Sequence, residues 1–277
     1  MMLASNLDEG VQRLRDLLRA SGPLLVAFSG GADSALVLAA AVHVLGPDQV
    51  FAATSTSASM PRSELAAARE FAADLGVRHL SVETQELRRR DYRANTNQRC
   101  YFCKSELLDV LLEVARTHDC VNVATGTNAD DARDTFRPGI KAADERSVLA
   151  PLRDAGLTKA QVREVSRRWG LRTWDKPAAP CLASRIAYGV PVDEARLGRV
   201  ERGEIEVRAL FEAHKRPLAD LRVRDLGGRV RVEVDAAQVD WLADSRLLRT
   251  ALDRAGFIGT PLDVAPFRSG ALNLLPT

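Results

Sequence analysis

The first 130 residues alternate short apolar runs with longer segments of helical periodicity, and this alternation constrains the fold more than any other feature. The predicted strands are 23–29, 49–57, 77–84 and 121–128, and the predicted helices between them are 33–46, 61–76 and 104–119. Strands separated by helices of this length form parallel sheets with helices on both faces. The sequence therefore predicts an α/β fold with a doubly wound parallel sheet.

The pattern changes after about Gly189. Residues 218–235 alternate in polarity around a Gly-Gly pair, which predicts a β-hairpin. We expect a helix at 238–256 and a final edge strand at 261–267. A chain of 277 residues is long enough for one large domain and a smaller one. We expect the large domain at 1–189 and a small α+β domain at 190–277.

Composition excludes several classes of protein. No apolar run approaches the roughly 18 residues that a membrane span needs, and the N-terminus resembles an amphipathic helix rather than a signal peptide. We therefore expect a cytoplasmic protein that does not associate with membranes. Lys plus Arg number 39 and Asp plus Glu 37, which argues against a nucleic-acid partner. Four cysteines are too few for a disulfide scaffold, so metal binding, catalysis or burial should account for them.

The stretch "FSGGADSALVL" lies where the first predicted strand leads into a helix. Gly30 and Gly31 allow a sharp turn that brings backbone N–H groups close to an anion, and the helix N-terminus adds its positive dipole. Ser29 and Ser34 supply hydroxyls, and Asp33 can cap the helix or orient a metal-bound phosphate. The alternative is a plain turn capped by Asp33. The loop lacks the Lys-Ser/Thr of a Walker A motif and the G-x-G-x-x-G of dinucleotide sites.

"SGGADS" resembles the SGGxDS loop of the ATP pyrophosphatase, or PP-loop, superfamily, which has an adenine nucleotide alpha hydrolase-like fold. These enzymes hold the pyrophosphate of ATP and transfer AMP to a carboxylate or carbonyl oxygen. The resemblance implies ATP and Mg²⁺ as cofactors. It also implies a pyrophosphate site made of the loop residues Ser29, Gly30, Gly31, Asp33 and Ser34.

Four longer segments, at 125–145, 150–171, 174–189 and 221–235, resemble the LarE family, with "PCLASRIAYG" as the most specific piece. LarE enzymes are ATP-dependent sulfur transferases of nickel-pincer nucleotide synthesis, which makes the cofactor of lactate racemase. The resemblance implies that a carboxylate of a pyridinium biscarboxylic acid mononucleotide is adenylated. Sulfur then replaces AMP to give a thiocarboxylate. The substrate is a small-molecule nucleotide, and the family tends towards homo-oligomers.

Cys181 suits this chemistry because a thiolate attacks an activated acyl group well, and cationic neighbours favour the thiolate. It lies between Lys176 and Arg185 in the sequence. Ser184 and Arg185 have side chains that can bind a phosphate. The alternative is that Cys181 is a small buried hydrophobe, as most free cysteines are. We predict catalytic roles for Cys181, Asp33 and Arg185.

Cys100 and Cys103 form a C-x-x-C pair. Some LarE enzymes lack this pair and give up the sulfur of the cysteine that matches Cys181. Others have three cysteines, as this chain has, and hold a [4Fe–4S] cluster whose fourth iron carries the transferred sulfide. The resemblance implies that Cys100, Cys103 and Cys181 are the cluster ligands. Zinc binding with a histidine, a redox couple and an inert pair stay as alternatives, and Cys120 is expected in the core.

The resemblance also assigns residues elsewhere in the chain. It implies nucleotide binding by Gly126, Thr127 and Asn128, substrate binding by Arg137, Arg222 and Arg224, and a divalent-metal contact by Glu204. Asp130 and Asp131 either hold magnesium or cap a helix start. The competing functions are a PP-loop tRNA thiolase, an amide-forming ligase, for which no ammonia source is visible, and a nucleotide or metal sensor without catalysis.

Overall fold

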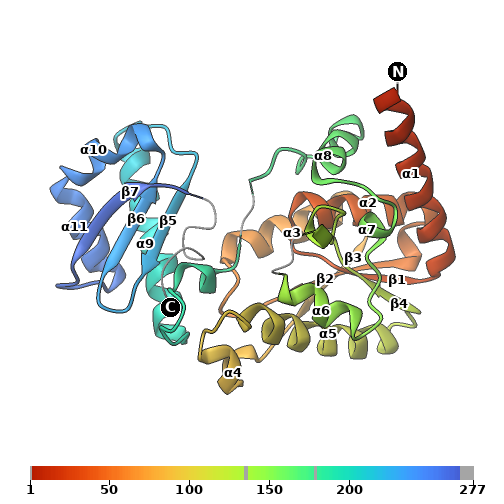
Figure 1. Ribbon diagram of the computed structural model, residues 1–277, viewed down its shortest axis with the longest axis horizontal. Helices are drawn as coiled ribbons and strands as arrows, with labels where there is room; N and C mark the ends of the chain where they lie inside the picture. Colours follow the sequence, from red (N-terminus) through yellow and green to blue (C-terminus); the bar gives the residue numbers. More distant parts are fainter. Residues whose placement is uncertain (1, 134–136, 178–179, 269–277) are drawn as a thin grey trace. The chain divides into compact units, whose positions relative to one another are not determined.

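The computed structural model describes residues 2–133, 137–177 and 180–268, and it comprises two compact units (Figure 1). The N-terminal unit is Met1–Glu86 with Cys100–Ala179, and the C-terminal unit is Leu87–Arg99 with Pro180–Thr277. The segment 87–99 therefore leaves the first unit and joins the second. The division into domains at 1–189 and 190–277 stays a prediction.

The N-terminal unit is built on four parallel strands in the order β3-β2-β1-β4. These strands are β1 (Leu24–Ala27), β2 (Val50–Ser55), β3 (Arg78–Val82) and β4 (Asn122–Ala124). Leu24 pairs with Val50 on one side and with Asn122 on the other. The predicted α/β fold with a parallel sheet is confirmed.

Helices cover both faces of this sheet (Figure 1). One layer contains α1 (Met2–Ser21), α2 (Ala32–Leu45), α3 (Arg62–Asp74), α7 (Pro151–Asp154) and α8 (Lys159–Arg168). The other contains α5 (Arg99–Thr117) and α6 (Pro138–Asp144). Because successive side chains of a strand point to opposite faces, Leu24 and Val26 pack in the first layer and Leu25 in the second.

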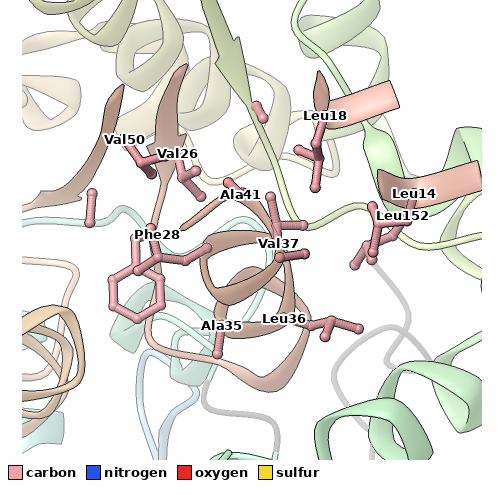
Figure 2. Close-up of a cluster of buried hydrophobic side chains, with 14 of the residues drawn as sticks. Leu14, Leu18, Val26, Phe28, Ala35, Leu36, Val37, Ala41, Val50 and Leu152 are labelled. Atoms are coloured by element: carbon pink, nitrogen blue, oxygen red, sulfur yellow. The ribbon is translucent and has the colours of Figure 1, made fainter. Parts of the chain in front are cut away.

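The larger core lies between β1 and the first helical layer (Figure 2). Val26 and Phe28 share this cluster with Val37 of α2 and with Leu14 and Leu18 of α1, all of them almost fully buried. β1 is apolar throughout because both of its faces are covered. The core thus fixes the end of β1, from which the glycine loop projects.

The C-terminal unit has a three-stranded sheet in the order β5-β6-β7. The strands are β5 (Leu221–Asp225), β6 (Val230–Val234) and β7 (Leu262–Pro266), with β5 antiparallel and β7 parallel to β6. The helices of this unit are α4 (Arg90–Arg93), α9 (Glu194–Ala213), α10 (Val239–Ala243) and α11 (Arg246–Ala255). Gly203 allows α9 to approach β5, since a Cβ there would lie 3.0 Å from the side chain of Val223.

Several elements differ from the sequence predictions. The helix predicted at 238–256 is interrupted, because Ser245 is extended between α10 and α11. The helix predicted at 104–119 begins at Arg99, which places both Cys100 and Cys103 in its first two turns. Residues 134–136 and 178–179, within two of the segments that carried the family resemblance, lie outside the described residues.

Short 3₁₀ turns complete the chain: η1 (Pro47–Gln49), η2 (Glu86–Arg88), η3 (Asp131–Arg133), η4 (Leu182–Arg185) and η5 (Ala236–Gln238). Among the described residues, every helix is too short or too polar to cross a membrane.

Candidate functional site

The glycine loop and the segment after β4 meet where the strand order reverses. From β1 the chain proceeds outward through β2 to β3, whereas β4 pairs on the opposite side of β1. Open α/β sheets bind ligands at this point, beyond the carboxyl ends of the strands. Gly30 has a φ of +72°, and Gly31 is the extended N-cap of α2, so the loop turns directly into a helix with unpaired N–H groups at its start.

A cavity of about 440 Å³ opens at this place in the N-terminal unit. Its size is typical of small-molecule sites. It is lined by Ala27, Phe28, Ser29, Gly31, Asp33, Ser34, Ala53, Thr54, Ser55, Met60, Lys104, Leu107, Thr125, Gly126, Thr127, Asp131 and Arg137. Two of the residues expected to bind the nucleotide in this unit, Gly30 and Asn128, are not part of this lining. Gly30 precedes Gly31, which lines the cavity, and Asn128 donates to Asp33, which also does.

Hydroxyl groups hold the loop in shape. Ser34 Oγ donates to the carbonyl of Gly31 at 3.1 Å, and it lies 3.1 Å from Ser29 Oγ, so Ser29 donates to Ser34. Gly126 packs directly against this turn, because a Cβ at residue 126 would lie only 2.6 Å from the backbone N of Ser34. The loop is therefore braced by the segment after β4 before any ligand arrives.

Asp33 and Asp131 provide two carboxylates in the cavity. Burial raises the pKa of Asp33, and the Asn128 side chain, which donates to Asp33 at 3.2 Å, opposes this effect. The side-chain oxygen of Asn128, Oδ1, in turn accepts from the backbone N–H groups of Asp130 and Asp131. Asn128 therefore positions Asp33. The two carboxylates are hard oxygen ligands of the kind that Mg²⁺ prefers.

Two cations line the same cavity. Arg137 forms an ion pair with Asp131, with Nη2 2.9 Å from Oδ1. Lys104 was not predicted as a site residue, and burial lowers the pKa of its amine, against the influence of neighbouring Cys103. The one feature of the sequence that could have indicated a site role for Lys104 is its position directly after the cysteine pair. Both cations suit the phosphates of a nucleotide.

Cys100 and Cys103 are three residues apart on α5, so they share one face of the helix. Cys100 is exposed and Cys103 half-buried. Cys120 is buried in the core beside α5, as predicted, and burial raises the pKa of its thiol. Within the described ranges no group of three or more His, Cys, Asp or Glu side chains is close enough to hold a metal ion.

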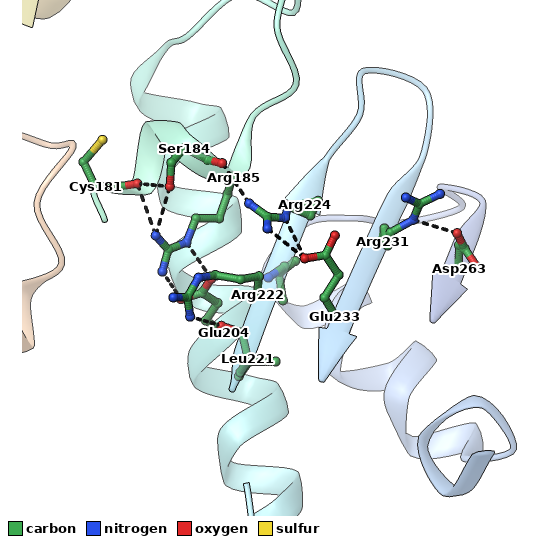
Figure 3. A network of polar contacts seen from close by, with 11 residues as sticks. Cys181, Ser184, Arg185, Glu204, Leu221, Arg222, Arg224, Arg231, Glu233 and Asp263 are labelled. Atoms are coloured by element: carbon green, nitrogen blue, oxygen red, sulfur yellow. Dashed lines mark hydrogen bonds and ion pairs between the residues drawn. The ribbon is translucent and has the colours of Figure 1, made fainter. Parts of the chain in front are cut away.

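In the C-terminal unit, Cys181 is half-buried at the start of η4 (Figure 3). Arg185 closes this turn, since its Nη1 donates to the carbonyls of Pro180 and Cys181. Ser184 Oγ donates to the Cys181 carbonyl at 2.7 Å. Arg185 also binds both carboxylate oxygens of Glu204, at 2.8 and 3.1 Å. Glu204 is thus engaged by an arginine here, rather than grouped with other metal ligands.

Two more arginines lie beside this turn on β5 (Figure 3). Arg224 donates to Glu233 at 2.7 and 3.0 Å and to the Ser184 carbonyl at 2.9 Å. Burial, reinforced by nearby Arg185, lowers the pKa of Arg222. Three guanidinium groups therefore lie beside the turn that follows Cys181, and two of them have carboxylate partners, Glu204 and Glu233.

Residues 3–94 match the family model for asparagine synthase. The whole chain is 40% identical to an uncharacterized protein of Synechocystis sp., over 279 residues and the full length of both. It is 31% identical to the pyridinium-3,5-bisthiocarboxylic acid mononucleotide synthase of Lactiplantibacillus plantarum, over 95% of this chain and 92% of that protein. Half of the chain is 32% identical to 37% of an argininosuccinate synthase of Halobacterium salinarum.

Proposed function

Because the chain belongs to the family of the pyridinium-3,5-bisthiocarboxylic acid mononucleotide synthase, the ATP-dependent sulfur transferases, we propose that it converts a pyridinium dicarboxylate mononucleotide into a thiocarboxylate. The observation that carries this proposal is the braced glycine loop at the strand-order reversal, in a cavity with two carboxylates and two cations. The product would serve nickel-pincer nucleotide synthesis.

The first step activates a carboxylate. A substrate carboxylate oxygen attacks the α-phosphorus of ATP, the bond to the bridging β-phosphate oxygen breaks, and pyrophosphate leaves. We assign the pyrophosphate to the loop N–H groups with Ser29 and Ser34, and the Mg²⁺ to Asp33 with Asp131. Lys104 stabilises the negative charge that grows on the α-phosphate. Gly126 and Thr127 wall the nucleotide, and Asn128 holds Asp33.

The second step transfers sulfur. A sulfur nucleophile attacks the acyl carbon, and AMP leaves with the electron pair of the carbon–oxygen bond. We propose that Arg185, Arg222 and Arg224 bind the phosphate of the substrate nucleotide, which would bring its acyl group to Cys181. Arg137 binds the second carboxylate of the substrate. This arrangement leaves Glu204 as the partner of Arg185, with divalent-metal binding as a secondary role.

We propose that Cys100, Cys103 and Cys181 hold a [4Fe–4S] cluster. The donor set fits, because the first two thiols share a helix face and neither they nor Cys181 are buried in a core, unlike Cys120. When bound, such a cluster would supply sulfide at the iron that lacks a protein ligand.

The compartment and the assembly of the enzyme also belong to this proposal. A reducing cytoplasm would keep the four cysteines as thiols and permit the cluster. The family tendency to form homo-oligomers leads us to propose a homo-oligomeric enzyme with a small-molecule substrate.

The activity is tested by incubating anaerobically reconstituted protein with Mg·ATP and the dicarboxylate mononucleotide. We expect AMP, pyrophosphate and a product 16 Da heavier, as oxygen is replaced by sulfur. Release of AMP without the mass change would mean that the chain adenylates but transfers no sulfur. No substrate-dependent AMP at all would refute the proposed function.

The sulfur source is tested separately by iron and acid-labile sulfide analysis. We expect about four irons per chain after reconstitution, lost in Cys100→Ala, Cys103→Ala and Cys181→Ala but kept in Cys120→Ala. A protein that never retains iron would rule out the cluster. A loss of about 34 Da from Cys181 after turnover would then identify this residue as the sulfur donor.

A further inference from the structure

Lys176 occupies a place next to the glycine loop that the proposed chemistry does not use. Its Nζ lies 3.0 Å from the carbonyl oxygen of Gly30 and 2.7 Å from Oε2 of Glu64 on α3. The two side chains of the ion pair are only 22% and 18% exposed. The ammonium group is therefore held against the loop backbone rather than left in solvent.

The main chain of Lys176 is itself fixed. Its N–H donates to the Thr173 carbonyl, and its carbonyl accepts from Nη2 of Arg163 on α8 at 3.1 Å. The ammonium thus extends from an anchored base, and its position relative to the loop is defined at both ends.

The contact has a direct consequence for the loop. The carbonyl of Gly30 and the N–H of Gly31 belong to one trans peptide unit, so they point in opposite directions. Gly31 lines the cavity, whereas Gly30 and Lys176 are not part of its described lining. A carbonyl drawn towards Lys176 therefore turns the Gly31 N–H towards the cavity. A free glycine peptide could rotate and present its carbonyl, which repels phosphate.

We propose that Lys176 is a positioning residue of the pyrophosphate site, which fixes the Gly30–Gly31 peptide with its N–H towards the bound phosphates. The inference rests on ATP binding at the loop in the proposed function, but not on sulfur transfer. Glu64 neutralises the ammonium, so Lys176 orients the donor without adding net charge to the site.

Calorimetric titration of the full chain with inorganic pyrophosphate in the presence of Mg²⁺ tests this role. Lys176→Met should weaken pyrophosphate binding about tenfold, because it loses a charge-assisted hydrogen bond and leaves the Glu64 carboxylate uncompensated. AMP, which lacks the β- and γ-phosphates, should bind within about twofold of the wild type. Lys176→Arg, which keeps the donor, should restore most of the affinity.

Glu64→Gln should not weaken pyrophosphate binding as Lys176→Met does. It leaves the positive charge uncompensated while keeping the carbonyl contact, so pyrophosphate should bind as well as in the wild type or more tightly. Lys141→Met is the matched control, since Lys141 is 73% exposed in a 3.9 Å ion pair on α6. It should change neither ligand's affinity.

Unchanged pyrophosphate binding in Lys176→Met would overturn this inference but leave the assignment of the ATP site intact. Equal weakening of both ligands by Lys176→Met and Glu64→Gln would also overturn it, since the pair would then only hold the fold together. If Lys176→Met fails to fold, Glu64→Gln replaces it as the test. A tenfold loss of pyrophosphate affinity in Glu64→Gln would overturn the inference. A wild-type protein that binds no pyrophosphate would overturn the inference together with the assignment of the ATP site.

Discussion

Replacing Gly126 by Ala should damage the nucleotide site through a single added methyl group. The new Cβ would lie 2.6 Å from the backbone N of Ser34 and 3.0 Å from the carbonyl carbon of Asp33. Ordinary contacts begin at 3.4 Å, so the start of α2 and residue 126 must separate by about 0.8 Å. The opposing atoms are backbone, and they cannot rotate away as the end of a side chain would.

The magnitude follows from this displacement. Overpacking of this kind costs about 1–3 kcal/mol of the free energy of unfolding. Shifting the loop by close to 1 Å should lower kcat/KM for ATP by about two orders of magnitude. The two effects are measured by urea unfolding and by substrate-dependent pyrophosphate release.

Gly139→Ala is the matched control for this variant. Its Cβ would meet its neighbours at 3.7 Å or more, and Gly139 lies in the first turn of α6, where Ala is a better helix former than Gly. It should keep its activity and gain stability. A Gly126→Ala protein with wild-type stability and kcat/KM would refute the claim that residue 126 braces the loop.

Three other variants probe the electrostatics and the core. Asp33→Asn should stabilise the protein against thermal unfolding at neutral pH. Burial raises the pKa of Asp33, so the ionised carboxylate costs the wild type stability at neutral pH. The stability advantage of Asp33→Asn should fade as the pH falls through that pKa, because the wild-type carboxyl is then neutral as well. The Mg·ATP-dependent activity of the variant should be at least tenfold lower at every pH. Glu233→Ala leaves the Arg224 guanidinium, 7% exposed, without its carboxylate, and urea unfolding should show a loss of about 3–5 kcal/mol. Cys120→Ala should cost about 1 kcal/mol and leave AMP release unchanged, whereas a loss of activity would place this thiol in the mechanism.

The sheet and the glycine loop were predictable because their signals are local. β1 is buried on both faces, which requires an unbroken apolar run, and the glycines that follow it mark the turn into α2. α9 was not predicted, because its charged residues are spread around the helix and only a few positions, such as Val207, are buried. The start of α5 was placed too late, since the aromatic and cysteine residues after Arg99 do not by themselves indicate a helix.

The electrostatic partners could not be predicted, because they depend on which segments the fold brings together. Lys176 and Glu64 are 112 residues apart in the sequence. Arg185 was expected at a phosphate, yet its guanidinium also closes the turn around Cys181 and binds Glu204. Sequence patterns identify residue types suited to a chemistry, whereas the pairing that tunes them arises only from tertiary contacts.

Helix α5 carries residues that we assign to both proposed half-reactions. Lys104 lines the nucleotide cavity, and Cys103 is the residue directly before it, so the cysteine pair lies within about one helical turn of the adenylation site. A structural zinc site would gain nothing from this position, because it needs a closed set of ligands away from solvent and substrate. A sulfur-delivering site does gain, since an acyl adenylate hydrolyses unless its nucleophile is already close. The place of the pair on α5 therefore favours sulfur delivery over a purely structural role.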